Sequence, residues 1–142
     1  MVIKKILLPI VCLIFTNNFY GQTLSETKQG LSDSTVFTKV DIEASFPGGD
    51  SKWVDYLQSN LNSMILVDKF APDGTYTAII KFIVRADGSV TDVYCENYPG
   101  YGVCEEGIRV IKKSKKWIPA QVNGKNVDSR RKQPISISKL GG

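Results

Sequence analysis

The strongest constraint on the fold is a pair of neighbouring segments, residues 75–86 and 90–97, joined by Asp87-Gly88. Side chains alternate along the first segment as they do on the two faces of a strand. One face carries Tyr76, Ala78, Ile80, Phe82 and Val84, and the other carries Thr75, Thr77, Ile79, Lys81, Ile83 and Arg85. Asp-Gly is a hairpin turn signal, so these residues predict two antiparallel strands. Val90 is out of phase with Val93 and Cys95, which predicts a bulge after Val90.

A helix is predicted before this hairpin, over residues 51–62. Trp53, Leu57 and Leu61 are spaced four residues apart and would form one apolar face that packs on the core. Asp50 stands directly before this stretch and is suited to cap the helix.

A second helix is predicted after the hairpin, over residues 103–114. It has acidic residues in its first turn and lysines in its last, as the helix dipole favours, so the lysine run indicates a solvated helix end. Trp117 would return the chain to the core, because Pro119 cannot continue a helix. Asn123-Gly124 then indicates a turn.

The last extended segment covers residues 127–138 and contains Pro134. Because proline has no backbone N–H, this segment should lie at a sheet edge or contain a bulge. Residues 40–46 suggest an extended strand or arm, and residues 64–74 a loop. The order helix, strand, strand, helix, strand predicts an α+β fold, with a three-stranded antiparallel sheet and two helices on one face.

The N-terminus has the pattern of a secretory signal peptide. Lys4 and Lys5 precede an apolar run at residues 6–15, and the small residue Gly21 follows. As a helix this run would rise about 15 Å, about half the hydrocarbon core of a bilayer, so an uncleaved anchor is the weaker alternative. We therefore expect an exported protein with a signal peptide (1–21), a flexible lead-in (22–39) and one folded domain (40–142).

Cysteine usage fits export. Removal of residues 1–21 would take away Cys12 and leave Cys95 and Cys104. An even count in an exported domain suggests a disulfide, worth about 2–3 kcal/mol for a loop of this length. Two buried free thiols are the alternative, and zinc is not expected because no other soft ligand is available.

Charge and composition narrow the function. The chain has no histidine, which removes the commonest general base and metal ligand. Residues 40–106 hold 11 acids and 4 bases, whereas residues 107–142 hold 1 acid and 10 bases. In an exported protein this basic surface suits an acidic peptide or membrane head groups, and no nucleic-acid partner is expected.

Several short motifs resemble the TonB C-terminal domain family over about residues 40–139. They are Gly74-Thr75-Tyr76, Asp87-Gly88, Tyr101-Gly102, Trp117-Ile118-Pro119-Ala120, Asn123-Gly124-Lys125 and Pro134-Ile135. Phe46-Pro47-Gly48-Gly49 and Arg131-Lys132-Gln133-Pro134-Ile135 are similar to the version found in Bacteroidetes-type bacteria. The Trp-x-Pro-Ala and Asn-Gly-Lys combination after the second helix is the most specific of these.

The resemblance implies a periplasmic domain of an energy transducer that binds a peptide of an outer-membrane transporter as an added strand. Here the edge would be residues 127–138, with partner-binding residues Val127, Arg130, Arg131, Lys132, Gln133 and Ile135. The same basic residues could instead only protect an exposed edge from aggregation. Full-length transducers have a membrane helix and a long proline-rich spacer. Here the apolar run is short and only residues 22–39 separate it from the domain, so the chain is similar to a free-standing copy. Whether it acts with a separate inner-membrane transducer complex stays open.

Two other function classes stay open. A cell-envelope structural or interaction protein would use the basic face on anionic surfaces without energy transduction. An enzyme would have to draw on Asp92, Glu96, Cys95, Cys104, Tyr98 and Tyr101, but nothing supplies the base that a nucleophile needs. We expect no enzyme activity, cofactor or metal, and leave open a homodimer formed by strand exchange.

Overall fold

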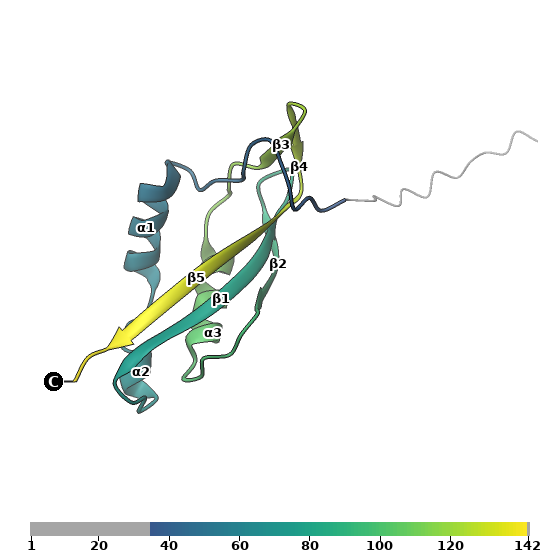
Figure 1. Cartoon of the computed structure of the whole chain (residues 1–142). Helices are drawn as coiled ribbons and strands as arrows, with labels where there is room; N and C mark the ends of the chain where they lie inside the picture. Colours follow the sequence, from purple (N-terminus) through teal and green to yellow (C-terminus); the bar gives the residue numbers. More distant parts are fainter. Residues whose placement is uncertain (1–34, 142) are drawn as a thin grey trace, which may run out of the picture. The chain divides into compact units, whose positions relative to one another are not determined.

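Strand β1 (Gly74–Val84) is the centre of the fold (Figure 1). The computed structural model describes residues 35–141, and in it β1 lies between β2 (Val90–Cys95) and β5 (Ser129–Lys139). Both neighbours are antiparallel to β1, and β5 pairs with it along its whole length, from Gly74 opposite Lys139 to Val84 opposite Ser129. The predicted hairpin and three-stranded antiparallel sheet are confirmed.

A bulge interrupts β2. Lys81 pairs with Tyr94 and Ile83 with Thr91, so two residues of β2 lie opposite Phe82 alone. One of them, Asp92, has a φ of 52°, and bulged strands bend at such points. The bulge predicted after Val90 is confirmed, and it falls at Asp92.

Helices α1 (Gly49–Asn60) and α3 (Val103–Lys113) pack on the same face of this sheet. Gly107 of α3 lies so close to β1 that an added Cβ would come within 2.9 Å of Ile80. Trp53 of α1 reaches the same face, and its Nε1 donates a hydrogen bond to Oε1 of Gln133 at 2.8 Å. Both predicted helices, and their placement on one face, are therefore confirmed.

Three local predictions need correction. Asp50 does not cap α1, because the helix begins at Gly49, two residues before the predicted start, and Asp50 lies inside it. Gly48, with a φ of 90°, takes the cap position without a side-chain bond. The expected loop at residues 64–74 contains the one-turn helix α2 (Ile65–Asp68). The predicted Asn123-Gly124 turn joins two short strands, β3 (Ala120–Val122) and β4 (Lys125–Val127), which form a separate small sheet. Elements of three or four residues are too short to show a period in the sequence.

The last strand begins at Ser129, two residues later than predicted. Val127 belongs to β4, where it pairs with Ala120. The chain therefore leaves one sheet and enters the other at Asp128, and Val127 is not part of the edge strand.

Residues 35–46 form an arm with bends at residues 38, 39 and 41, so residues 40–46 match the expected arm and not a continuous strand. Ile42 bridges Gln121, Ser45 bridges Ile118, and Phe37 forms a parallel bridge with Ser129. The predicted signal peptide and the lead-in up to residue 34 lie outside the described residues. Within residues 35–141 no helix has the length and apolar character needed to span a bilayer.

Candidate functional site

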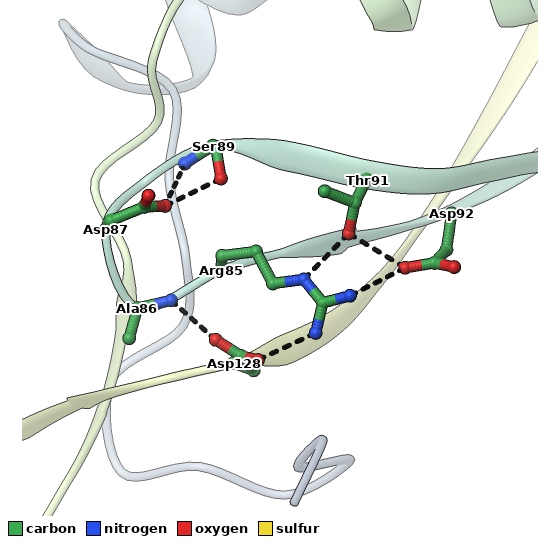
Figure 2. A network of polar contacts seen from close by, with 7 residues as sticks. All are labelled: Arg85, Ala86, Asp87, Ser89, Thr91, Asp92 and Asp128. Carbon is green, nitrogen blue, oxygen red and sulfur yellow. Dashed lines mark hydrogen bonds and ion pairs between the residues drawn. The ribbon is translucent and has the colours of Figure 1, made fainter. Parts of the chain in front are cut away.

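The side chain of Arg85 holds the N-terminal end of β5 in place (Figure 2). Its guanidinium donates to Thr91 Oγ1 at 2.8 Å, to Asp92 Oδ2 at 2.9 Å and to Asp128 Oδ2 at 2.8 Å. The hydrogen bond to Asp128 is the main reason that the pKa of Arg85 is raised. The contacts join the end of β1 to β2 and to the junction between β4 and β5.

Asp128 completes this junction with its second oxygen and its backbone. Oδ1 accepts a hydrogen bond from the N–H of Ala86 at 2.7 Å, and the backbone carbonyl accepts one from the N–H of Phe37 at 2.8 Å. The turn after β1, the junction and the arm are thus held together, which sets where β5 begins.

The outer edge of β5 is defined by the direction of its backbone groups. The N–H of Arg130 donates to the carbonyl of Phe37 at 3.0 Å, so it points away from β1. Because backbone direction alternates along a strand, the N–H groups of Lys132, Ser136 and Ser138 point the same way. In the part of the chain that the structure describes, no backbone segment pairs with this edge beyond Arg130.

Pro134 lies in the middle of this outer edge, opposite Ile79 of β1. It shares the phase of Arg130, so its missing N–H falls on the outer side and no bond to β1 is lost. The prediction that proline places this segment at a sheet edge is confirmed.

A groove runs beside the outer edge near the C-terminal end of β5. It holds about 260 Å³ and is lined by Gln58, Leu61 and Ser63 on one side and by Ser136, Ile137 and Ser138 on the other. The end of α1 and the residues after it therefore border the edge without pairing with its backbone.

The predicted partner-binding residues of β5 divide between the two faces of the sheet. Arg130 and Lys132 are exposed on the open face, away from the helices. Ile135 is 2% exposed in the core, Gln133 is bonded to Trp53, and Arg131 forms an ion pair with Glu43 at 3.2 Å. The structure thus leaves two of the predicted side chains exposed on the open face and engages the other three in contacts within the chain.

Glu96 contacts the open face of the sheet, and it is not among the partner-binding residues predicted from the sequence. Its carboxylate forms an ion pair with Lys81 of β1 and, at 3.4 Å, with Lys132 of β5. The hydrogen bond from Lys81 is the main cause that holds the pKa of Glu96 below its usual range. Alternation placed Lys81 on this face, but no local signal indicates that Glu96 bridges two strands.

Cys95 and Cys104 are joined in a disulfide, as predicted. The alternative of two free thiols is thereby set aside, and neither sulfur is available as a nucleophile. Of the other candidate catalytic groups, Asp92 is bound to Arg85 and Glu96 to two lysines. Among residues 35–141 no three His, Cys, Asp or Glu side chains gather as a metal site would require.

No protein-family model, curated protein or solved structure matches this chain.

Proposed function

We propose that the chain is a periplasmic module of the TonB C-terminal type that binds a peptide segment of an outer-membrane transporter. The peptide would add as a strand to the outer edge of β5, and the chain would serve TonB-dependent transport as a binding protein, not as an enzyme. The observation that carries the proposal is the unpaired edge beyond Arg130 in the described chain.

Strand addition suits this edge chemically. Lys132, Ser136 and Ser138 offer N–H donors and carbonyl acceptors. Pro134 offers only a carbonyl, which already accepts one hydrogen bond, from Nε2 of Gln133 at 2.8 Å. Main-chain bonds of this kind supply affinity for an extended peptide of many sequences, while neighbouring side chains set preference. The positive charges of Arg130 and Lys132 would favour acidic residues in the peptide.

The test is a titration of the mature protein with synthetic peptides from the N-terminal segments of outer-membrane transporters. Hydrogen exchange of individual backbone amides is the measurement. We expect a binding peptide to slow exchange at Lys132, Ser136 and Ser138, because their N–H groups become bonded. Exchange at Arg131 and Gln133 should change less, because the backbone N–H groups of these residues already point toward β1.

A matched pair of variants isolates the backbone contribution. Ser136→Pro removes one outward donor and also breaks the hydroxyl pair between Ser136 and Thr77, whose oxygens lie 2.7 Å apart. Thr77→Val breaks the same pair and leaves the donor in place. Peptide affinity should fall about fivefold to tenfold in the first variant and stay near wild type in the second, given the net worth of one hydrogen bond. Equal affinities in both variants, or no protection along β5 with any peptide, would contradict strand addition.

A cell-envelope interaction protein is the second candidate, and the lysine run favours it. Lys112, Lys113, Lys115 and Lys116 are all exposed around the end of α3, and none has a carboxylate within ion-pair distance in residues 35–141. Binding to anionic vesicles that disappears at moderate salt would support this function, since exposed charges are screened. Strand addition should persist under the same conditions.

A further inference from the structure

A hollow of about 300 Å³ lies on the open face of the sheet, on the side away from the helices. Its lining includes Lys81 and Ile83 of β1, Asp92 and Tyr94 of β2, and Arg130 and Lys132 of β5. Phe82 and Arg131 also line it, although their side chains are engaged with Trp117 and Glu43. The size is at the lower end of small-molecule sites. It is built by side chains on a sheet face and does not involve the outer edge of β5.

The hollow carries a surplus of positive charge. Lys81 lies directly opposite Lys132, and Ile83 lies opposite Arg130, so three cations occupy two neighbouring register positions on the open face. Like charges placed across a strand pair destabilise a sheet. The fold compensates only part of this repulsion, because both lysines share the single carboxylate of Glu96.

Arg130 is the cation left over. Within residues 35–141 its side chain makes no hydrogen bond or ion pair, and the nearby carboxylate of Asp92 is bound to Arg85 and Thr91. The hydrogen bond to Glu96 raises the pKa of Lys81, whereas the charge of Arg130 lowers it, as expected for two cations in proximity. A guanidinium with five donors and no acceptor is thus available at the rim of the hollow.

Apolar surface lies next to this guanidinium. Tyr94 is 45% exposed and supplies most of this surface, whereas Ile83, on the same face, is only 7% exposed. An arginine fork recognises the two oxygens of a carboxylate or phosphate, and an aromatic ring with a buried aliphatic side chain favours a flat apolar group beside it.

We propose that this hollow binds a small organic oxyanion, a carboxylate or phosphate carried on an aromatic or short apolar body. The oxyanion pairs with Arg130 and Lys132, and the apolar body lies over Ile83 against Tyr94. The site shares Arg130 and Lys132 with the proposed peptide surface but does not depend on strand addition.

The experiment is an NMR titration of the mature protein with four probes: phenyl phosphate, benzoate, inorganic phosphate and phenol. We expect saturable shifts at Ile83, Tyr94 and Arg130 with phenyl phosphate, benzoate or both, and the stronger of the two identifies the oxyanion. Inorganic phosphate lacks the apolar ring, and phenol lacks the oxyanion. Each should bind about tenfold more weakly, because it loses either the burial of a ring or a charge-assisted hydrogen bond.

Two neighbouring variants separate the site from general charge. Arg130→Gln should weaken binding about tenfold or more, because it removes the charged donor. Arg131→Gln removes the same charge one residue away, but from a side chain that is paired with Glu43. This variant should bind the organic anion with an affinity within about twofold of wild type, the scale expected of one screened surface charge. Tyr94→Ala should abolish the preference for phenyl phosphate over inorganic phosphate.

Three outcomes would overturn the proposal: no saturable shifts with either organic anion, undiminished binding in Arg130→Gln, or equal weakening of binding by Arg130→Gln and Arg131→Gln. Dispersed spectra of each variant confirm that it is folded. Ser136→Pro should leave anion binding unchanged while it weakens peptide pairing, so failure of this site and failure of strand addition are told apart.

Discussion

Gly88 and Gly124 are turn glycines with similar backbone conformations and different surroundings. Their φ angles are 85° and 74°, both in the left-handed region that favours glycine. A Cβ at Gly88 would lie 2.2 Å from the carbonyl oxygen of Trp117, whereas one at Gly124 would meet nothing within 4 Å. Gly88 is also bonded to Trp117, whose N–H donates to its carbonyl at 2.8 Å. This close contact joins the hairpin turn to the segment after α3.

We predict that Gly88→Ala destabilises the fold far more than Gly124→Ala. The alanine at 124 should cost about 1 kcal/mol, for the left-handed conformation alone. The alanine at 88 should cost about 2 kcal/mol more, because the Trp117 backbone must move. Urea midpoints measure both variants. Equal midpoints would mean that the Trp117 backbone can shift at little cost and that its close contact with Gly88 does not contribute to stability.

Glu106 is a buried carboxylate that joins α3 to the chain after α1. It is 6% exposed, accepts hydrogen bonds from Arg109 at 2.6 and 2.8 Å, and accepts one from the N–H of Asn62 at 2.7 Å. The bonds from Arg109 are the main cause that lowers the pKa of Glu106. The charged form is therefore favoured in the folded state.

This arrangement predicts a loss of stability in acid. A carboxyl whose pKa is lower folded than unfolded stabilises the fold above the unfolded value, about 4.3, and loses that contribution as the pH falls through the folded pKa. Glu106→Gln should cost about 1–2 kcal/mol at pH 7 and less at pH 3. Glu105→Gln, at an exposed position in the same turn, is the control. Unfolding curves at both pH values test this, and a difference between wild type and Glu106→Gln that does not shrink in acid would contradict it.

At the scale of elements, the disulfide is the covalent link between β2 and α3. Cys95 is the last residue of β2, Cys104 is the second residue of α3, and the two are nine residues apart. The bridge closes the loop that carries Tyr98 and Tyr101, and both cysteines are buried. It therefore restricts the unfolded chain in a segment that has no regular structure of its own.

We predict that the double variant Cys95→Ala/Cys104→Ala is less stable by about 2–3 kcal/mol, from loop entropy and lost packing. Reductant present throughout a urea titration should lower the wild-type midpoint to about that of the double variant. The midpoint of the double variant itself should not change with reductant. A wild-type midpoint that does not respond to reductant would show that the link contributes no stability.

Element length largely decided what the sequence could predict. β1, α1 and α3 each have 11 or 12 residues, enough to show a period of two or of about four. α2, β3 and β4 have three or four residues each and form through contacts from elsewhere. The start of β5 was predicted two residues early, because it depends on bonds from Arg85 and Phe37 to Asp128, far apart in the sequence.

In the candidate site, features that depend on a single residue could be predicted from the sequence, and features that depend on strand pairing could not. Pro134 predicted the edge position because its missing donor is a property of one residue. Which side chains of β5 point to the open face depends on the phase of the strand, and the missing donor of one proline does not give this phase for the side chains. The prediction from sequence therefore includes Gln133 and Ile135, which face the helices. The bridge from Glu96 to Lys81 and Lys132 depends on strand order and could not be read locally.

At the scale of the whole molecule, one aromatic cluster joins the arm, α1, the sheet and the segment after α3. Its members are Phe46, Trp53, Tyr56, Phe82 and Trp117. The ring of Trp117 lies 4.9 Å from Trp53, 5.3 Å from Phe82 and 5.8 Å from Phe46, measured between centroids. Because each part contributes a ring to the same contact, none of them can leave without exposing the others.

We therefore predict that the arm does not unfold separately from the rest of the domain. Phe46→Ala should lower the free energy of unfolding by about 2–3 kcal/mol and keep a single transition, because the ring it removes contacts both tryptophans. Phe70→Ala is the control, since Phe70 is 90% exposed and the loss of its ring should change stability by less than about 0.5 kcal/mol. Tryptophan fluorescence follows the cluster and far-UV circular dichroism follows the helices and strands. Coincident urea curves by the two methods are expected for wild type and Phe46→Ala. A fluorescence transition that precedes the circular dichroism transition would instead mean that the cluster opens while the sheet stays folded.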